Sequence, residues 1–231
     1  MKSLACIHVR LEGFSAFFKH PLTVSGTQIS MPTPSYSTIL GLISACAGKT
    51  ITHKDTRIGF EFRCSSSDIE LERTERMLVD NKGQLKPHRE GQGILKRHIY
   101  FRPKLDLYLT NLNLKESFEN PVSTPSLGRS QDIAWINFVK EIELTPRQSG
   151  LLGPTMIPFI QENISGLILK CPEWFNNTMK GRTRLAGPFG RYQAMLPTTS
   201  DRFQVSLPEL YHPSDAASEG DVIYLHRWIE A

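Results

Sequence analysis

Alternating apolar and polar residues mark four segments of the first 144 residues as strands. These segments are residues 4–11, 57–64, 99–110 and 135–144. Successive side chains of a strand point to opposite faces, so the alternation predicts strands with one face more buried than the other. The stretch after the first strand, residues 13–26, lacks this pattern. We expect a loop there, held by the aromatic anchors Phe14, Phe17 and Phe18.

Helical spacing replaces the alternation in MPTPSYSTILGLISACAGKT, residues 31–50. Thr33 is predicted as the N-cap, and Pro34 suits the first helical position because its missing N–H would be unpaired there anyway. Gly48 fits the left-handed position that follows a helix. Gly41 costs stability inside a helix, so we expect something to approach the backbone closely at this residue.

The order of the predicted elements indicates an α+β fold. With a short helix in residues 111–120, the chain reads β-α-β-β-α-β, the order of a modified ferredoxin-like, or RNA-recognition-motif-like, domain. We assign residues 1–144 to this domain. Eight prolines divide residues 145–231 into short segments, which predicts a smaller, irregular, β-rich part packed on the first.

An arm is predicted between the second and third strands, at about residues 66–104. Asp80-Asn81-Lys82-Gly83 is typical of a hairpin turn, because Asn and Gly tolerate positive φ. Residues 81–104 carry seven Lys and Arg against one acidic residue, Glu90, and few apolar residues lie near the turn. We interpret the segment as a protruding thumb that binds a polyanion. The alternative is a solvated hairpin whose charge run has no function.

The distribution of charge favours a nucleic-acid partner. The whole chain is only +4, whereas residues 81–104 are +6 and residues 170–191 are +4, so the remainder is negative. Segregated basic charge of this kind is expected of a nucleic-acid binder.

The four cysteines are scattered without metal-ligand spacing, and we expect no metal and no cofactor. No membrane span or signal peptide is expected, which predicts a cytoplasmic protein.

Phosphate-loop, dinucleotide-binding, zinc-protease and nucleophile-elbow motifs are missing from the sequence. The aromatic consensus of the RNA-recognition-motif third strand is also missing, so RNA would not be bound on that module's usual stacking platform.

Two further basic segments are candidates for phosphate binding. In the loop 126–132, Gly128 would allow close approach and Arg129 would be a forked phosphate donor; the alternative is a turn whose arginine pairs with Asp132. The second is the glycine-rich segment 180–191, or else a solvated loop.

Met31–Gly41, MPTPSYSTILG, resembles the proline-rich entry to the first helix of the Cas-five family, and SLGRSQDIA at 126–134 resembles that family's loop before its last core strand. The family is a subunit of type I CRISPR surveillance complexes (Cascade). The arm stands where the family inserts its thumb, and KRHIYFRPKLDLYL resembles the return strand. The likeness covers residues 1–144 and is closest to an I-B-like subtype.

The resemblance implies a non-enzymatic subunit that holds the 5′ handle of the guide RNA (crRNA). Its partners would be the Cascade backbone subunits, the large subunit and, near the protospacer-adjacent motif, target DNA. Handle phosphates would be bound by cations and backbone amides, and splayed bases by edge contacts and stacking. The candidate RNA-binding residues are Tyr36, Lys82, Lys86, His88, Arg89, Lys96, Arg97, His98, Arg102, Gly128, Arg129, Ser130, Arg182, Arg184 and Arg191.

Two alternatives remain open at this point. One is a metal-independent endoribonuclease that processes precursor guide RNA, as some family members do; the resemblance would then make Tyr36, Lys96 and His98 the catalytic residues. A 2′-hydroxyl attack needs a base and a cation, so these residue types are chemically suitable, although Arg97 separates the lysine from the histidine. The other alternative is a generic RNA-binding module outside any CRISPR complex.

Overall fold

A computed structural model describes residues 3–20, 23, 26–159, 164–176, 184–198 and 202–229, without the side chain of Glu90. It contains one long helix, α1 (Tyr36–Ala47), a 3₁₀ turn, η1 (Leu112–Leu114), and a short helix, α2 (Lys115–Glu119). The strands up to the second helix are β1 (Leu4–Gly13), β2 (Ser15–Ala16), β3 (Thr27–Gln28), β4 (Ile58–Arg63), β5 (Ser66–Val79), β6 (Leu85–Phe101) and β7 (Lys104–Leu109). The later strands are β8 (Ala134–Leu152), β9 (Met156–Pro158), β10 (Leu167–Pro172), β11 (Phe175–Asn176), β12 (Leu185–Ala186), β13 (Phe189–Ala194), β14 (Phe203–Pro213) and β15 (Asp221–Tyr224).

The main sheet has the strand order β14-β15-β8-β1-β7-β4. Within it, β8, β1, β7 and β4 are antiparallel neighbours, and they are the four strands that the alternation predicts. With α1 after β1 and α2 after β7, they give the predicted β-α-β-β-α-β order. The chain therefore has the predicted α+β, ferredoxin-like core with an inserted hairpin.

The core lies between this sheet and α1. Ile39 and Ile43 of α1 pack in one buried cluster with Ile7, Val9 and Leu11 of β1, all of them fully buried. The predicted C-terminal end of the helix is confirmed, because Gly48 has φ 65° and its N–H bonds the carbonyl of Ala45.

Two details of this helix differ from the prediction. The N-cap is Ser35, whose hydroxyl accepts from the Thr38 N–H at 3.2 Å, and Thr33 lies outside the helix. Because the Ser35 hydroxyl caps the helix, the first helical residue is Tyr36, and Pro34 stands before the cap. No chain atom lies within 4 Å of a Cβ built on Gly41, so the expected close approach does not come from the described part of this chain.

The predicted third strand is divided in two. Residues up to Phe101 continue β6 of the arm, and β7 of the main sheet begins at Lys104. Between them Arg102 has φ 48° and Pro103 follows, so the chain turns from one sheet into the other. The fourth strand is longer than predicted because the second half of β8 pairs with β14 after the first half has paired with β1.

The C-terminal segments add to both the sheet and the core. The strands β14 and β15 extend the main sheet beside β8, while β10, β13 and β9 form a separate three-stranded sheet. Leu169, Cys171 and Tyr192 of this small sheet belong to the same buried cluster as α1. The division of the chain into domains at residue 144 stays a prediction.

Candidate nucleic-acid interface

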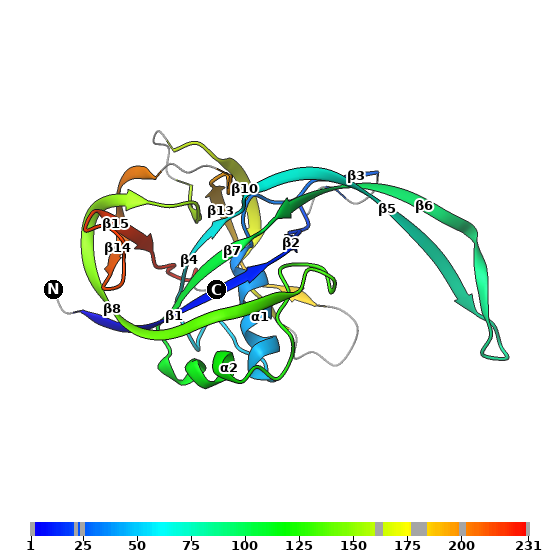
Figure 1. Ribbon diagram of the computed structural model, residues 1–231, viewed down its shortest axis with the longest axis horizontal. Coiled ribbons are helices and arrows are strands. Elements are labelled where there is room, and N and C mark those ends of the chain that lie inside the picture. The colour runs from blue at the N-terminus through cyan, green and yellow to red at the C-terminus, as the bar shows by residue number, and fades with distance from the viewer. Residues whose placement is uncertain are drawn as a thin grey trace.

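The arm is an ordered hairpin of two long strands. Figure 1 shows β5 and β6 projecting as a ribbon away from the rest of the molecule. The strands are 14 and 17 residues long and are paired from Ser66–Phe101 to Val79–Leu85. At about 3.3 Å per residue the arm is about 45 Å long. The predicted turn is confirmed: Asp80 accepts N–H bonds of 2.9 Å from Lys82 and Gln84, and Gly83 has φ 76°.

Near its root, part of the arm's basic charge is neutralised within the arm. The strand β5 carries Glu70 and Glu72 where β6 carries Arg97, and Arg97 lies within 2.9 Å of Glu72. The Arg97 guanidinium also donates to Gln28 at 2.6 Å and lies 4.6 Å from the Phe17 ring centre. Arg97 is 8% exposed, so it supports the arm's root and presents little surface to an RNA phosphate.

The loop 126–132 is locked in a similar way. The Arg129 guanidinium forms a two-pronged pair with Asp132, with two N–O distances of 2.9 Å, and a third bond of 3.0 Å to Glu72. Ser15 donates to the same Asp132 at 2.6 Å. Burial alone would raise the pKa of the Asp132 carboxyl, but these bonds outweigh it and hold the pKa below its usual value. The loop thus has the arginine–Asp132 turn that we named as the alternative to phosphate binding.

The glycine of this loop also serves the fold. Gly128 has φ 126°, and a Cβ on it would overlap the carbonyl oxygen of Phe17. The loop therefore packs directly against the backbone of Phe17, which follows the strand β2 that pairs with β6. Ser130, beside it, is exposed.

Several of the predicted arm cations remain open to solvent. Lys82, Arg89, Lys96 and Arg102 are exposed, and none of them has an ion pair with any residue that the structure describes. Lys86 is also exposed but lies 2.8 Å from Asp80. His88 and His98 are half-buried; burial lowers the pKa of His98, whose ring lies 5.2 Å from that of Tyr100. The exposed basic part of the arm consists of Lys82, Lys86, Arg89, Lys96 and Arg102.

Tyr36 lies in the core, away from this surface. It is 1% exposed, its hydroxyl donates to the Met156 carbonyl, and its ring stacks on His226 at 3.9 Å. Burial raises the pKa of its phenol well above the usual value. A base cannot stack on Tyr36 in this conformation, which differs from the role expected at the helix start. Of the three residues of the endoribonuclease alternative, Lys96 and His98 both lie in β6, and the ring of His98 has Tyr100 as its neighbour, whereas that of Tyr36 has His226.

The glycine-rich segment is only partly described. Arg182 lies outside the described residues, and Arg184 and Arg191 are exposed. Arg191 of β13 stands opposite Lys170 of β10, so two like charges are neighbours at that edge. Whether these residues contact RNA stays a prediction.

An exposed aromatic pair at the arm's root was missed from the sequence. Phe14, predicted as a loop anchor, is 77% exposed and lies 5.2 Å from the ring of Trp135, which is 41% exposed. Arg102 and Lys104 line the same 410 Å³ hollow. Exposed aromatic rings beside cations suit the stacking of unpaired bases. No pattern in the sequence distinguishes the exposed Phe14 from the buried Phe17 and Phe18.

A charged network covers the outer face of the main sheet. His8 lies between Asp106 and Asp215, at 2.9 and 2.7 Å, and Arg10 lies 2.6 Å from Asp106. Burial alone would lower the pKa of His8, but the two carboxylates outweigh it and raise the pKa. Since most of these charges are paired, this face offers less to a polyanion than the arm does.

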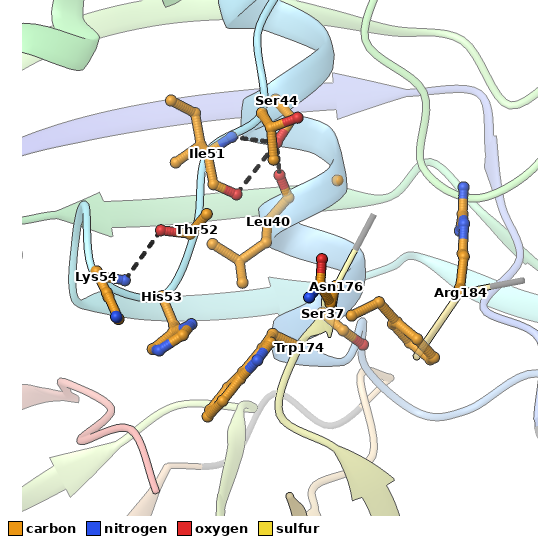
Figure 2. A pocket seen from close by; sticks show the side chains of 13 residues that line it. Ser37, Leu40, Ser44, Ile51, Thr52, His53, Lys54, Trp174, Asn176 and Arg184 are labelled. Carbon is orange, nitrogen blue, oxygen red and sulfur yellow. Dashed lines mark hydrogen bonds between the residues drawn. The ribbon is translucent and has the colours of Figure 1, made fainter. Parts of the chain in front are cut away.

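A second hollow, of about 480 Å³, lies beside α1 (Figure 2). It is lined by the outward side of that helix, by residues 50–54, by residues 174–176 at β11, and by Arg184, which precedes β12. Two other possible features are missing from the described ranges: a cluster of three or more potential metal ligands, and a helix long and apolar enough to cross a membrane.

No protein-family model matches the chain, and no curated protein matches its sequence. Among solved structures, a chain of a "CRISPR RNA-guided surveillance complex" matches with a TM-score of 0.53 and 12% identity, over 87% of this chain and 91% of that chain. A chain of the Type III-B Cmr-beta complex bound to cognate target RNA has a TM-score of 0.48 at 11% identity, over 82% and 84%. A CRISPR protein from Archaeoglobus fulgidus has 0.46 at 12% identity, over 96% and 100%. The last two TM-scores are too low to establish a shared fold. At its low identity the first likeness establishes the fold alone: the chain has the fold of a chain in a CRISPR RNA-guided surveillance complex.

Proposed function

We propose that this protein is a guide-RNA-binding subunit of a CRISPR effector complex, of the Cascade type, and that it holds the 5′ handle of the guide. The observation that carries the proposal is the arm: about 45 Å of ordered hairpin with exposed Lys82, Arg89 and Lys96 along β6 and its preceding turn. An extended basic hairpin can contact several phosphates of an RNA backbone along its length. The fold shared with a surveillance-complex chain agrees with this function.

The apolar tip of the arm supports a second contact, with a neighbouring protein subunit. Val79 and Leu85 face each other across the tip and are each 67% exposed, and Met77 and Leu78 beside them are about half exposed. Exposed apolar side chains gathered at one end mark a contact surface. The arm would therefore lie between the guide RNA and the first backbone subunit of the complex.

The locked root explains how so long a hairpin can hold a fixed direction. Arg97, Arg129, Glu72 and Asp132 join both arm strands to the loop before β8 through charged hydrogen bonds. Such bonds are short and directional, so they orient the arm before RNA arrives. In the proposed function these residues position the arm, and the exposed cations bind phosphate.

We propose further that the protein does not cleave its guide. The buried Tyr36 and the half-buried His98 have separate ring neighbours, with His226 beside the first and Tyr100 beside the second. A cleaving site needs a base and a cation held on either side of one phosphate. Another subunit would then process the precursor.

The decisive experiment is co-expression of the tagged chain with the other subunits and a repeat-containing RNA, followed by affinity purification. We expect the guide RNA and the backbone and large subunits to be recovered with the wild-type chain. With a variant in which Lys82, Arg89 and Lys96 are changed to Glu, we expect less guide RNA and less of the partner subunits to be recovered. Equal recovery of RNA with that variant would disprove the proposed role of the arm. Recovery of RNA without any partner subunit would favour the generic RNA-binding module.

A further inference from the structure

The hollow beside α1 is lined by three separate parts of the chain. Leu40 and Gly41 come from the helix, His53 from the loop after it, and Phe175 and Arg184 from the paired strands β11 and β12 or the residue just before β12. Figure 2 shows His53 and Trp174 on one side, Arg184 on the other, and Ser37 and Asn176 between them. The volume of about 480 Å³ is in the range of small-molecule sites and would hold one nucleotide.

Gly41 contributes empty space to this hollow. It lies in the middle of a 12-residue helix, where glycine costs about 1 kcal/mol relative to alanine. Nothing in the described chain lies within 4 Å of a Cβ built there, so no packing inside the protein requires the glycine. The missing side chain instead leaves the helix surface open at the hollow. A flat group from outside the chain could therefore lie directly against the helix.

The walls of the hollow are fixed by the chain's own contacts. Ser44 donates to the Leu40 carbonyl at 2.7 Å and accepts from the Ile51 N–H at 2.9 Å, which ties the loop to the helix. The His53 ring stacks on the Trp174 indole at 3.7 Å with an interplanar angle of 16°. A hollow held in this way is ready for a ligand before the ligand binds, which lowers the entropic cost of binding.

The lining is cationic and aromatic. Lys54 and Arg184 both line it. Among the described residues, no carboxylate lines it, and neither cation has an ion pair. Phe175 is 38% exposed and presents a ring, while Ser37 and Asn176 present polar atoms. Positive charge together with aromatic and polar side chains matches a nucleotide, with its negative phosphate, flat base and hydrogen-bonding base edge.

We infer that this hollow binds one nucleotide of the RNA, with its base turned out of the strand and laid on the helix at Gly41, and its phosphate near Arg184 or Lys54. The inference rests on the proposed function, because the nucleotide comes from the RNA that the arm holds. The site is separate from the arm, so one can be altered without the other.

The test is fluorescence anisotropy with the full chain and two labelled probes, an octamer of adenosine ribonucleotides and an octamer of abasic ribose phosphates. In Gly41→Leu the hollow is filled, and leucine is a better helix former than glycine, so the melting temperature should not fall. We expect Gly41→Leu to weaken binding of the adenosine octamer at least fivefold and to leave the abasic octamer unchanged. The loss of one stacked base is worth about 1–3 kcal/mol, which is about 5- to 150-fold.

Gly41→Ala is the intermediate variant, because it improves the helix and adds only a methyl group. It should weaken binding of the adenosine octamer less than Gly41→Leu does, and it should leave binding of the abasic octamer unchanged. Arg184→Gln should lower the affinity for both probes by a similar small factor, as expected from the loss of a phosphate contact. A second readout is photocrosslinking of an RNA that contains 5-iodouridine. We expect the wild-type protein to crosslink at Phe175 or Trp174, and Gly41→Leu to form no crosslink at these residues.

Other outcomes separate this inference from the proposed function. Charge reversal in the arm could lower the affinity for both probes while Gly41→Leu binds the adenosine octamer as the wild type does. In that case the nucleotide site is disproved and the proposed function stands. If Gly41→Leu binds RNA normally but no longer joins the other subunits, a protein segment occupies the hollow and the inference is wrong. If the wild-type chain and the assembled complex bind no RNA, both the inference and the proposed function fail.

Discussion

Arg129, in the loop before β8, forms an ion pair of 3.0 Å with Glu72 of the arm strand β5. The same guanidinium holds the fully buried Asp132 through two hydrogen bonds. One arginine thus joins the projecting arm to the body of the protein. A residue that the sequence suggests as a phosphate ligand is, in the structure, surrounded by three carboxylates, those of Glu70, Glu72 and Asp132.

Replacement of this arginine should therefore lower the stability of the protein. Arg129→Ala leaves the Asp132 carboxylate buried without its partner, and breaking such a pair costs about 3 kcal/mol or more. We expect a clear fall in the urea midpoint, measured by circular dichroism. The double variant Arg129→Met with Asp132→Leu should recover part of the loss, because Asp132 no longer leaves a buried charge unpaired, while the Ser15 hydroxyl and the N–H of residue 129 still lose their acceptor. A stable Arg129→Ala protein with strongly reduced RNA affinity would instead make the residue a phosphate ligand.

The exposed cations of the arm should set the salt dependence of RNA binding. For single strands, each phosphate contact contributes about 0.7 to the slope of log K against log salt concentration. Reversal of Lys82 and Arg89 should reduce that slope by about 1.4 if each makes one such contact, and should lower the affinity at low salt. Reversal of Arg147 and Arg227, both on the body, is the control and should have a much smaller effect. An unchanged slope in the arm variant would show that the hairpin is passive.

The aromatic pair at the arm's root should contribute to binding in a way that salt does not change. Phe14→Ala removes an exposed ring, so the fold should lose little stability, while the loss of a stacked base costs about 1–3 kcal/mol of binding. We expect weaker binding of a purine-rich RNA with the salt slope preserved. Phe14→Trp is the matched variant and should bind at least as well as the wild type. If Phe14→Ala binds as the wild type does, the pair does not stack on RNA.

Much of the fold can be predicted from local sequence signals, whereas the roles of the charged residues cannot. The four core strands are predicted by period-two alternation, and the arm's turn from Asp80 to Gly83 by turn chemistry. The sequence also shows the acidic residues of β5 and the basic residues of β6. Their effect depends on strand register, which places Glu70 opposite Arg97 and brings Glu72 to Arg129. Contacts between distant segments decide such roles, and no local pattern encodes them.

Burial of individual aromatic residues is equally hard to predict. Tyr36 follows the N-cap of the helix, where a tyrosine can face either solvent or core. It is buried because β9 and the segment after β15 cover it, through Met156 and His226. These segments come more than a hundred residues later in the chain. The same reason explains why Phe14 is exposed while Phe17 and Phe18 are buried.

The charged cluster on the outer face of the sheet should make the stability depend on pH. The folded protein raises the pKa of His8, so its contribution is full below the unfolded value of about 6.5 and is lost as the pH rises through the folded value. Asp106 and Asp215 have lowered pKa values, so their contribution is lost on acidification below about 4. Stability from this cluster should be greatest between about pH 4 and 6.5.

The measurement is the melting temperature of the wild type and of His8→Gln across about pH 4 to 9. The difference in melting temperature between the two proteins should be largest near about pH 6 and should become smaller towards about pH 9. The His8 ring also packs on Tyr108 and Phe138, at 4.3 and 4.9 Å between ring centres, and Lys140 stands opposite it on β8; all three are kept in both proteins. A gap that stays constant with pH would show that His8 is neutral throughout and acts by packing alone.

The last prediction is that the protein leaves precursor RNA intact. Cleavage by the 2′-hydroxyl needs a group that takes its proton, and Tyr36 is unsuited because burial raises the pKa of its phenol and Met156 already accepts its hydrogen. Tyr36→Phe should cost only about 1 kcal/mol of stability, the value of one hydrogen bond, with no effect on the RNA. Incubation of the purified chain with a repeat-containing precursor in EDTA should give no site-specific product, in the wild type or in His98→Ala. A product that the wild type forms and His98→Ala does not would make Lys96 and His98 part of a metal-independent endoribonuclease site.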